Sequence, residues 1–146
     1  METTKVEAAQ SASEIVAVLV RHGAKSINTE YDKGRITGLR WVMTVNAMDV
    51  LFDMPARVEP VFKRLSREAP GHQIERLKQK AERIAWRQLL RWVQAQMAMI
   101  DMGMAQTAEV FLPYIVPPNG RQRLFDTLME SEFKMLPAGR DDTRSN

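Results

Sequence analysis

Five basic side chains recur at helical spacing in the middle of the chain: Arg76, Lys80, Arg83, Arg87 and Arg91. On a helical wheel of about 100° per residue they fall within one narrow stripe, which we call the cationic row. With a rise of about 1.5 Å per residue, the row is roughly 22 Å long, enough to follow several phosphates of a nucleic-acid backbone. Arginine suits this chemistry because its planar guanidinium donates paired hydrogen bonds to a phosphate or a carboxylate.

The excess positive charge of the chain is concentrated around this row. The net charge is +3, but residues 61–91 alone hold nine basic and three acidic residues, while the segments before and after them carry −1 and −2. On the wheel, the acidic Glu75 and Glu82 fall away from the row, so we expect them not to neutralise it fully. The alternative interpretation is a solvated helix face with no ligand, a common use of long basic side chains.

A second group of residues on and after the same segment could contact a protein partner: Trp86, Leu90, Met97, Met102 and Phe111. Four methionines lie within eight residues here, and methionine-rich surfaces serve adaptable interfaces and contacts between copies of one chain. The same residues can equally fill a core. If they are exposed, they would be the anchors of an interface or of a homo-oligomer, and the cationic row would meet an acidic partner.

Residue types needed for most catalytic and metal sites are scarce. The chain has no cysteine and two histidines, and it contains no phosphate-binding loop, nucleophile elbow or zinc-binding helix motif. Asp49 and Asp53 share one face of an expected strand and could hold a hard metal ion. Nothing in the sequence supplies further oxygen ligands, which favours solvated charges instead. We expect no metal, no cofactor and no enzymatic activity.

The elements that position these residues follow from periodicity. A capping box at Ser11 and apolar spacing predict a helix over about 13–22. Three segments of alternating polarity, separated by turns at 32–34 and 46–47, predict a three-stranded antiparallel meander. From residue 58 the pattern is helical: a short amphipathic helix, a long amphipathic helix over about 72–101, a short helix capped by Thr107 and a last helix over 121–133. The fold class is α+β.

The long helix is expected to bury the face opposite the cationic row. This face comprises Ile74, Leu77, Ala81, Ala85, Leu89, Trp92, Gln96 and Met99. Leu90 and Met97 fall outside this arc, so we expect the C-terminal helices or a second subunit to cover them. Residues 1–10 are predicted to be a flexible leader, 11–136 a single domain and 137–146 a flexible tail. No apolar run approaches the roughly 20 residues of a membrane span, which favours a cytoplasmic protein without membrane contact.

The chain also resembles a family of small phage and prophage proteins of unassigned function. The resemblance rests on an Ala-Trp-Arg start at 85–87, Trp92, Ala95-Gln96, Gly103-Met104 and the run Val-Phe-Leu-Pro-Tyr at 110–114, and it covers roughly 15–136. It implies a phage context and carries no catalytic residues. The order of elements also matches double-stranded-RNA-binding domains, but the glycine-rich strand end and Lys-Lys-Ala helix start of that family are absent, which leaves an analogy of topology.

Together these patterns predict a non-enzymatic phage-type accessory protein that binds nucleic-acid backbone through the cationic row with low sequence specificity. The alternative is a protein-interaction module that acts as an adaptor or as an inhibitor of a host factor. An anti-defence protein is one example. Exposure of the row discriminates between a surface and an internal ion-pair network. The network would form if the row packed against the acidic residues of the C-terminal helices, namely Glu109, Asp126, Glu130 and Glu132.

Overall fold

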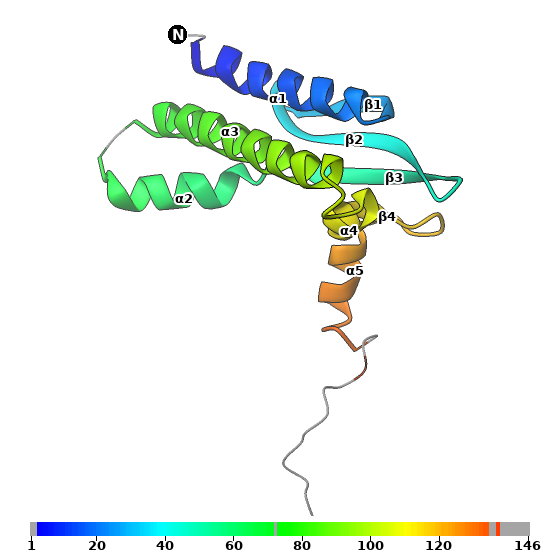
Figure 1. Ribbon diagram of the computed structural model, residues 1–146. Coiled ribbons are helices and arrows are strands. Elements are labelled where there is room, and N and C mark those ends of the chain that lie inside the picture. The colour runs from blue at the N-terminus through cyan, green and yellow to red at the C-terminus, as the bar shows by residue number, and fades with distance from the viewer. Residues whose placement is uncertain (1–2, 72, 135–136, 138–146) are drawn as a thin grey trace, which may run out of the picture.

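The computed structural model of the protein (Figure 1) describes residues 3–71, 73–134 and 137. In chain order the elements are α1 (Thr3–Arg21), β1 (Lys25–Asp32), β2 (Arg35–Val45), β3 (Met48–Pro55), α2 (Val58–Glu68), α3 (Ile74–Asp101), α4 (Thr107–Phe111), the 3₁₀ turn η1 (Leu112–Tyr114), β4 (Ile115–Val116) and α5 (Leu124–Glu130). The α+β class, the N-terminal helix and the long helix are confirmed. None of the described helices is both long and apolar enough to cross a membrane.

The predicted meander forms, with one strand more than expected. All pairs in the sheet are antiparallel and the strand order is β1-β2-β3-β4. Both predicted turns are present, and each contains two residues in the left-handed region, with φ of 51° and 77° at Lys33 and Gly34. The prediction of three strands is wrong because β4 has only two residues. A segment of that length shows no alternation, and it is a strand only because it pairs with Phe52 of β3.

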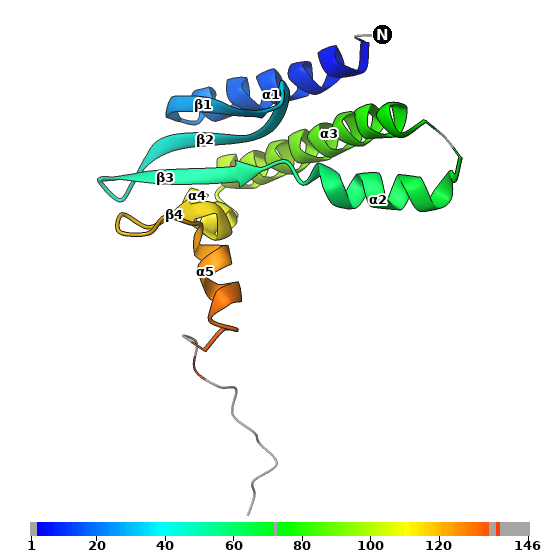
Figure 2. The same ribbon diagram turned by 180° about the vertical axis from the view of Figure 1, so that it is seen from behind.

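The helices α1 and α3 run side by side over one face of the sheet, and α2 lies against the other side of α3 (Figures 1 and 2). The centre of the core is aromatic. Trp41 of β2 stacks on Phe52 of β3 with ring centroids 5.4 Å apart, and Phe111 of α4 meets both rings edge-on. Such pairs add about 0.5–1.5 kcal/mol each beyond the area they bury. This cluster therefore joins the sheet to the C-terminal part of the chain.

The first helix is longer than predicted. It begins at Thr3, so residues 3–10, which were expected to belong to a flexible leader, are helical. The reason is packing: the small side chains Ala8, Ser11 and Ala12 are buried in the interface of α1, and the helix therefore continues through the expected cap at Ser11. Residues 138–146 of the predicted tail lie outside the described residues. The last helix is shorter than predicted, and Gln106 rather than Thr107 caps α4.

The buried face of α3 is also different from the predicted one. Leu77, Ala81 and Ala85 are buried as expected, but Ile74 and Met99 are exposed. The other buried side chains of α3 are Glu82, Trp86, Leu90, Val93 and Met97. The physical reason is that α3 packs on two sides, against α2 on one and against the sheet and α1 on the other. A wheel drawn for one buried face cannot represent a helix between two neighbours.

The opposite face of the sheet carries paired charges. Asp49 accepts hydrogen bonds from the Lys25 ammonium and the Thr44 hydroxyl, each at 2.9 Å, and Asp53 pairs with Arg40 at 3.7 Å. These contacts favour the interpretation of Asp49 and Asp53 as strand surface charges. The hydrogen bond from Lys25 contributes most to lowering the pKa of the Asp49 carboxyl below its ordinary value, and the bond from Thr44 adds to it.

Gly38 of β2 lies close against the backbone of β3. A Cβ at this position would lie 2.8 Å from the carbonyl oxygen of Met54 and 3.1 Å from the Cα of Pro55. Both atoms belong to backbone, so they cannot move aside without shifting β3. We expect Gly38→Ala to lower the free energy of unfolding by about 1–3 kcal/mol in urea titrations. The neighbouring exposed variant Thr37→Ala is the control, and equal stability of the two variants would contradict the close packing.

The Lys25→Ala variant tests the surface pairs of the sheet. Because Lys25 holds the Asp49 carboxylate, its removal should raise the pKa of Asp49 towards the ordinary value, measured by NMR titration of the carboxyl carbon. A carboxyl with a lowered pKa stabilises the fold above its unfolded pKa, and this stabilisation is lost as the pH falls through the folded value. The variant should therefore lose less stability than the wild type on acidification. An unchanged Asp49 titration would contradict the pairing.

Candidate nucleic-acid interface

Four of the five members of the cationic row are exposed on the surface of α3. Arg76, Lys80, Arg87 and Arg91 are exposed, and no salt bridge involves any of the four within the described part of the chain. The Arg91 guanidinium donates to the Gln88 side-chain oxygen at 3.2 Å. We call these four residues the exposed row.

Arg83 differs from the other members of the predicted row. Its side chain is half-buried, and its guanidinium is 3.5 Å from a carboxylate oxygen of Glu7 on α1. The wheel places Arg83 on the edge of the row nearest α1, and the parallel packing of the two helices brings Glu7 to it. Arg83 thus joins the two helices, and an anion at the row would have to compete with Glu7 for its charge.

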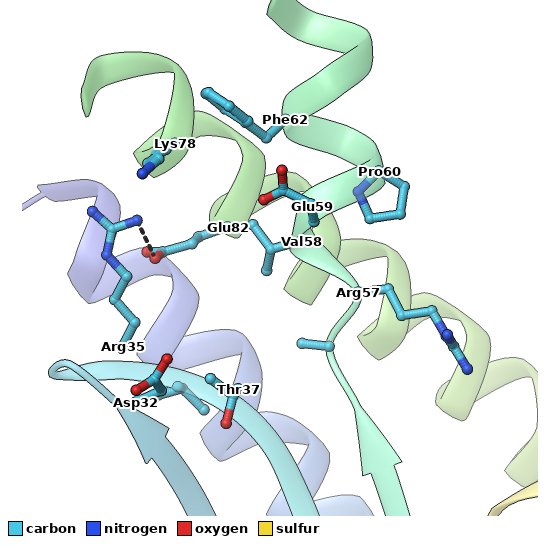
Figure 3. Close-up of a pocket in the computed structure, with 12 residues that line it drawn as sticks. Asp32, Arg35, Thr37, Arg57, Val58, Glu59, Pro60, Phe62, Lys78 and Glu82 are labelled. Carbon is cyan, nitrogen blue, oxygen red and sulfur yellow. Dashed lines mark ion pairs between the residues drawn. The ribbon is translucent and has the colours of Figure 1, made fainter. Parts of the chain in front are cut away.

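Two of the three acidic residues of α3, Glu75 and Glu82, share a single arginine of the sheet, and the third, Asp101, lies 2.9 Å from His22 of the segment after α1. Glu82 is 6% exposed, and its carboxylate lies 3.1 Å from one terminal nitrogen of Arg35 on β2. The other terminal nitrogen of Arg35 donates to Glu75, which lies about two helical turns before Glu82. Figure 3 shows the Arg35–Glu82 pair reaching across from strand to helix. Glu75 and Glu82 are therefore directed to Arg35 and not to the cations of the exposed row.

The sequence contains no local signal for the role of Arg35. It lies 40 residues before Glu75 and 47 before Glu82, on an element with a different period. Only the packing of α3 on β2 brings these residues together. The same packing directs the indole nitrogen of Trp86 to the Ile36 carbonyl oxygen, to which it donates at 3.2 Å.

The acids of the C-terminal helices do not neutralise the row. Asp126 pairs with Arg123 at 2.8 Å, and Glu130 accepts from the Gln122 amide at 2.9 Å. Glu109 accepts from the backbone of Gln106, and Glu132 lies near Lys134. The internal ion-pair network that would have argued against a charged surface is therefore not formed by these residues.

The hypothesis of a partner surface is wrong for four of its five anchors. Trp86, Leu90, Met97 and Phe111 are buried, with exposed fractions between 0% and 8%. They belong to the same core cluster as Ile15 and Leu19 of α1, which supply the cover that was expected from C-terminal helices or a second subunit. These four residues are part of the core because α1 is long enough to cover this side of α3.

Met102 is the one predicted anchor on the surface, with 77% of its area exposed, and Met104 beside it is 65% exposed. Both follow the C-terminal end of α3, at the opposite end from Arg76. Together with Met99, which is 36% exposed, they are the exposed methionines of the predicted methionine-rich stretch. A single chain does not test homo-oligomer formation, which stays a prediction.

A cavity of about 540 Å³ lies on the other side of α3, between α2 and the β1–β2 hairpin (Figure 3). Its charged lining consists of Asp32, Arg35, Arg57, Glu59, Lys78 and Glu82. Cations and carboxylates are equal in number, and Arg35 and Glu82 already satisfy each other. Lys78 lies over the Phe62 ring at 5.7 Å, while Arg57 extends away from the cavity. This balance gives the cavity no preference for one sign of charge.

Within the described residues, histidine, aspartate and glutamate side chains nowhere gather in threes in a way that could hold a metal ion. The expectations of no metal, no cofactor and no enzymatic activity nevertheless stay predictions.

The Arg35 contacts can be tested by comparing two isosteric variants. Glu82→Gln places a neutral amide in a buried position against Arg35, whereas Glu75→Gln does so at an exposed one. We expect the first to lower the free energy of unfolding by about 1–3 kcal/mol and the second by less than about 1 kcal/mol, because exposed pairs contribute little. Chemical denaturation measures both. Equal losses would show that burial of Glu82 does not determine the strength of the pair.

Comparison with known proteins does not identify a ligand for this site. The chain matches no known protein family, no curated protein and no solved structure. The resemblance to phage proteins therefore stays a prediction, and the geometry of the exposed row alone supports the functional argument.

Proposed function

We propose that the protein binds the sugar-phosphate backbone of a nucleic acid through Arg76, Lys80, Arg87 and Arg91. The single observation that supports this is their arrangement: four exposed cations along one helix face, with the acids of that helix directed elsewhere. Backbone contacts position a nucleic acid without reading its bases, so the binding has little sequence preference. The accessory role in a phage context belongs to this proposal as a prediction from the resemblance.

The orientation of the acids favours this function over a merely solvated helix face. Solvated faces of long helices usually mix charges of both signs, which stabilises the helix through pairs three or four residues apart. Here Glu75 and Glu82 turn towards Arg35, so four like charges remain along the row without such compensation. Like charges on one face repel one another, and this cost is offset when phosphates replace the small counterions around them.

The number of cations sets the expected dependence on salt. Each neutralised phosphate contributes about −0.7 to −0.9 to the slope of log K against log salt, so four contacts predict a slope of about −3 to −4. Between about 50 and 200 mM salt the affinity should fall roughly 50- to 150-fold. A steeper slope would require further cations, and the nearest candidate is Arg83, provided that it leaves Glu7.

The double variant Arg87→Glu/Arg91→Glu tests the proposal. Both side chains are exposed and neither forms a salt bridge within the described chain, so folding should be retained. We expect binding to a fluorescent oligonucleotide, followed by anisotropy at low salt, to weaken by more than tenfold. The slope against salt should become shallower by about 1.4 to 1.8, since each lost contact removes about 0.7 to 0.9.

The matched control is Lys33→Glu/Arg121→Glu, which changes the net charge equally at two exposed positions away from α3. It should retain most of the affinity and the full slope. Equal weakening by both double variants would reduce the effect to net charge and contradict a specific row. Absence of binding by the wild type at low salt would end the proposal.

A further inference from the structure

A smaller cavity of about 340 Å³ lies beside the C-terminal end of the exposed row. Its lining comes from the end of β3, the start of α2, the middle of α3 and η1, and consists of Pro55, Arg57, Val61, Ala85, Gln88, Leu89, Trp92 and Tyr114. Six of these eight residues present apolar or aromatic surface. This is the composition typical of small-molecule sites: an apolar pocket with few polar groups to orient the ligand.

The polar side chains that line this cavity favour an anionic or neutral ligand over a cationic one. Arg57 supplies one positive charge and Gln88 supplies an amide, and none of the residues that line it is acidic. Gln88 also connects the cavity with the row, because its side-chain oxygen accepts from the Arg91 guanidinium at 3.2 Å. A ligand held at Arg91 by an anionic group would therefore have its neighbouring part at the mouth of the cavity.

The aromatic rings in the cavity wall are held in place by contacts with other aromatic rings. Trp92 meets Phe111 of the core edge-on at 5.5 Å and Tyr114 at 5.9 Å. Trp41 and Trp86 are fully buried, whereas Trp92 is partly exposed. A flat aromatic group that enters the cavity thus meets a wall that does not need to be ordered on binding, which lowers the entropic cost of association.

From this juxtaposition we infer that the cavity receives one unstacked nucleobase of a single strand whose phosphates lie along the exposed row. The inference rests on the proposed function and deepens it by naming the form of the nucleic acid. Single strands are bound by the combination present here, a cationic track with aromatic side chains beside it. A duplex keeps its bases stacked inside, so it could contact the row but not fill the cavity.

Three probes separate the two parts of the inference: oligothymidylate, an abasic strand of the same length and a blunt duplex. Trp92 is the tryptophan that a bound base would approach, so its fluorescence reports on the cavity, while anisotropy reports on binding as such. We expect oligothymidylate to quench the tryptophan emission and to bind about tenfold more tightly than the abasic strand, which should bind without quenching. The duplex should bind without quenching.

Two variants change the cavity by opposite means. Val61→Phe fills it from α2, and Tyr114→Leu removes an aromatic wall. Either should bring the affinity for oligothymidylate down to that for the abasic strand, and neither should change the salt dependence of abasic binding. Leu112→Phe, which adds a similar volume at an exposed position outside the cavity, is the matched control. If one cavity variant fails to fold, the other still decides the test.

The outcomes distinguish failure of the inference from failure of the function. Equal affinity and equal quenching for base-bearing and abasic strands would overturn the base site and leave the row intact. Tighter binding of the duplex, with quenching, would also overturn it. If no strand binds at low salt, the proposed function fails first, and the inference fails with it.

Discussion

The anchoring of α3 to strand β2 sets the orientation on which the other features of this molecule depend. Two contacts fix the rotation of the helix about its axis: the Trp86 indole donates to the Ile36 carbonyl oxygen, and Glu82 pairs with Arg35. Both are buried or nearly so, and a buried polar group left without a partner is costly. A rotation of α3 would break them together. The direction of the exposed row is therefore a consequence of how the helix packs.

This anchoring also separates the acidic from the basic side chains of α3. Glu75 and Glu82 of α3 turn to the sheet, where both pair with Arg35, and four basic side chains remain on the outside. A helix that placed its acids between its cations would be a better isolated helix, since pairs one turn apart stabilise it. Here tertiary packing supplies the stability through the core cluster of α1, α3 and the sheet, which leaves the outer face available for a ligand of opposite charge.

Periodicity predicted most elements because each long element has one strongly preferred environment. The strands β2 and β3 alternate over residues 39–43 and 52–54, where every second side chain enters the core, and α3 lacks proline and glycine over its whole length. The failures have physical causes. The two residues of β4 are a strand only through pairing, and the small residues Ala8, Ser11 and Ala12 of α1 form no strong apolar pattern although they are buried. The wheel for α3 failed because the helix has neighbours on two sides.

The sequence by itself determined the residue types and their spacing: five cations on one face of one helix, no cysteine and few histidines. Those are local properties, and helical geometry converts them directly into a stripe. Tertiary structure decided which faces are covered. It buried Trp86, Leu90, Met97 and Phe111, joined Arg83 to Glu7 and left four cations exposed. It also placed Tyr114 beside Trp92, in the wall of a cavity that Gln88 shares. These outcomes depend on contacts between distant segments, which no local pattern encodes.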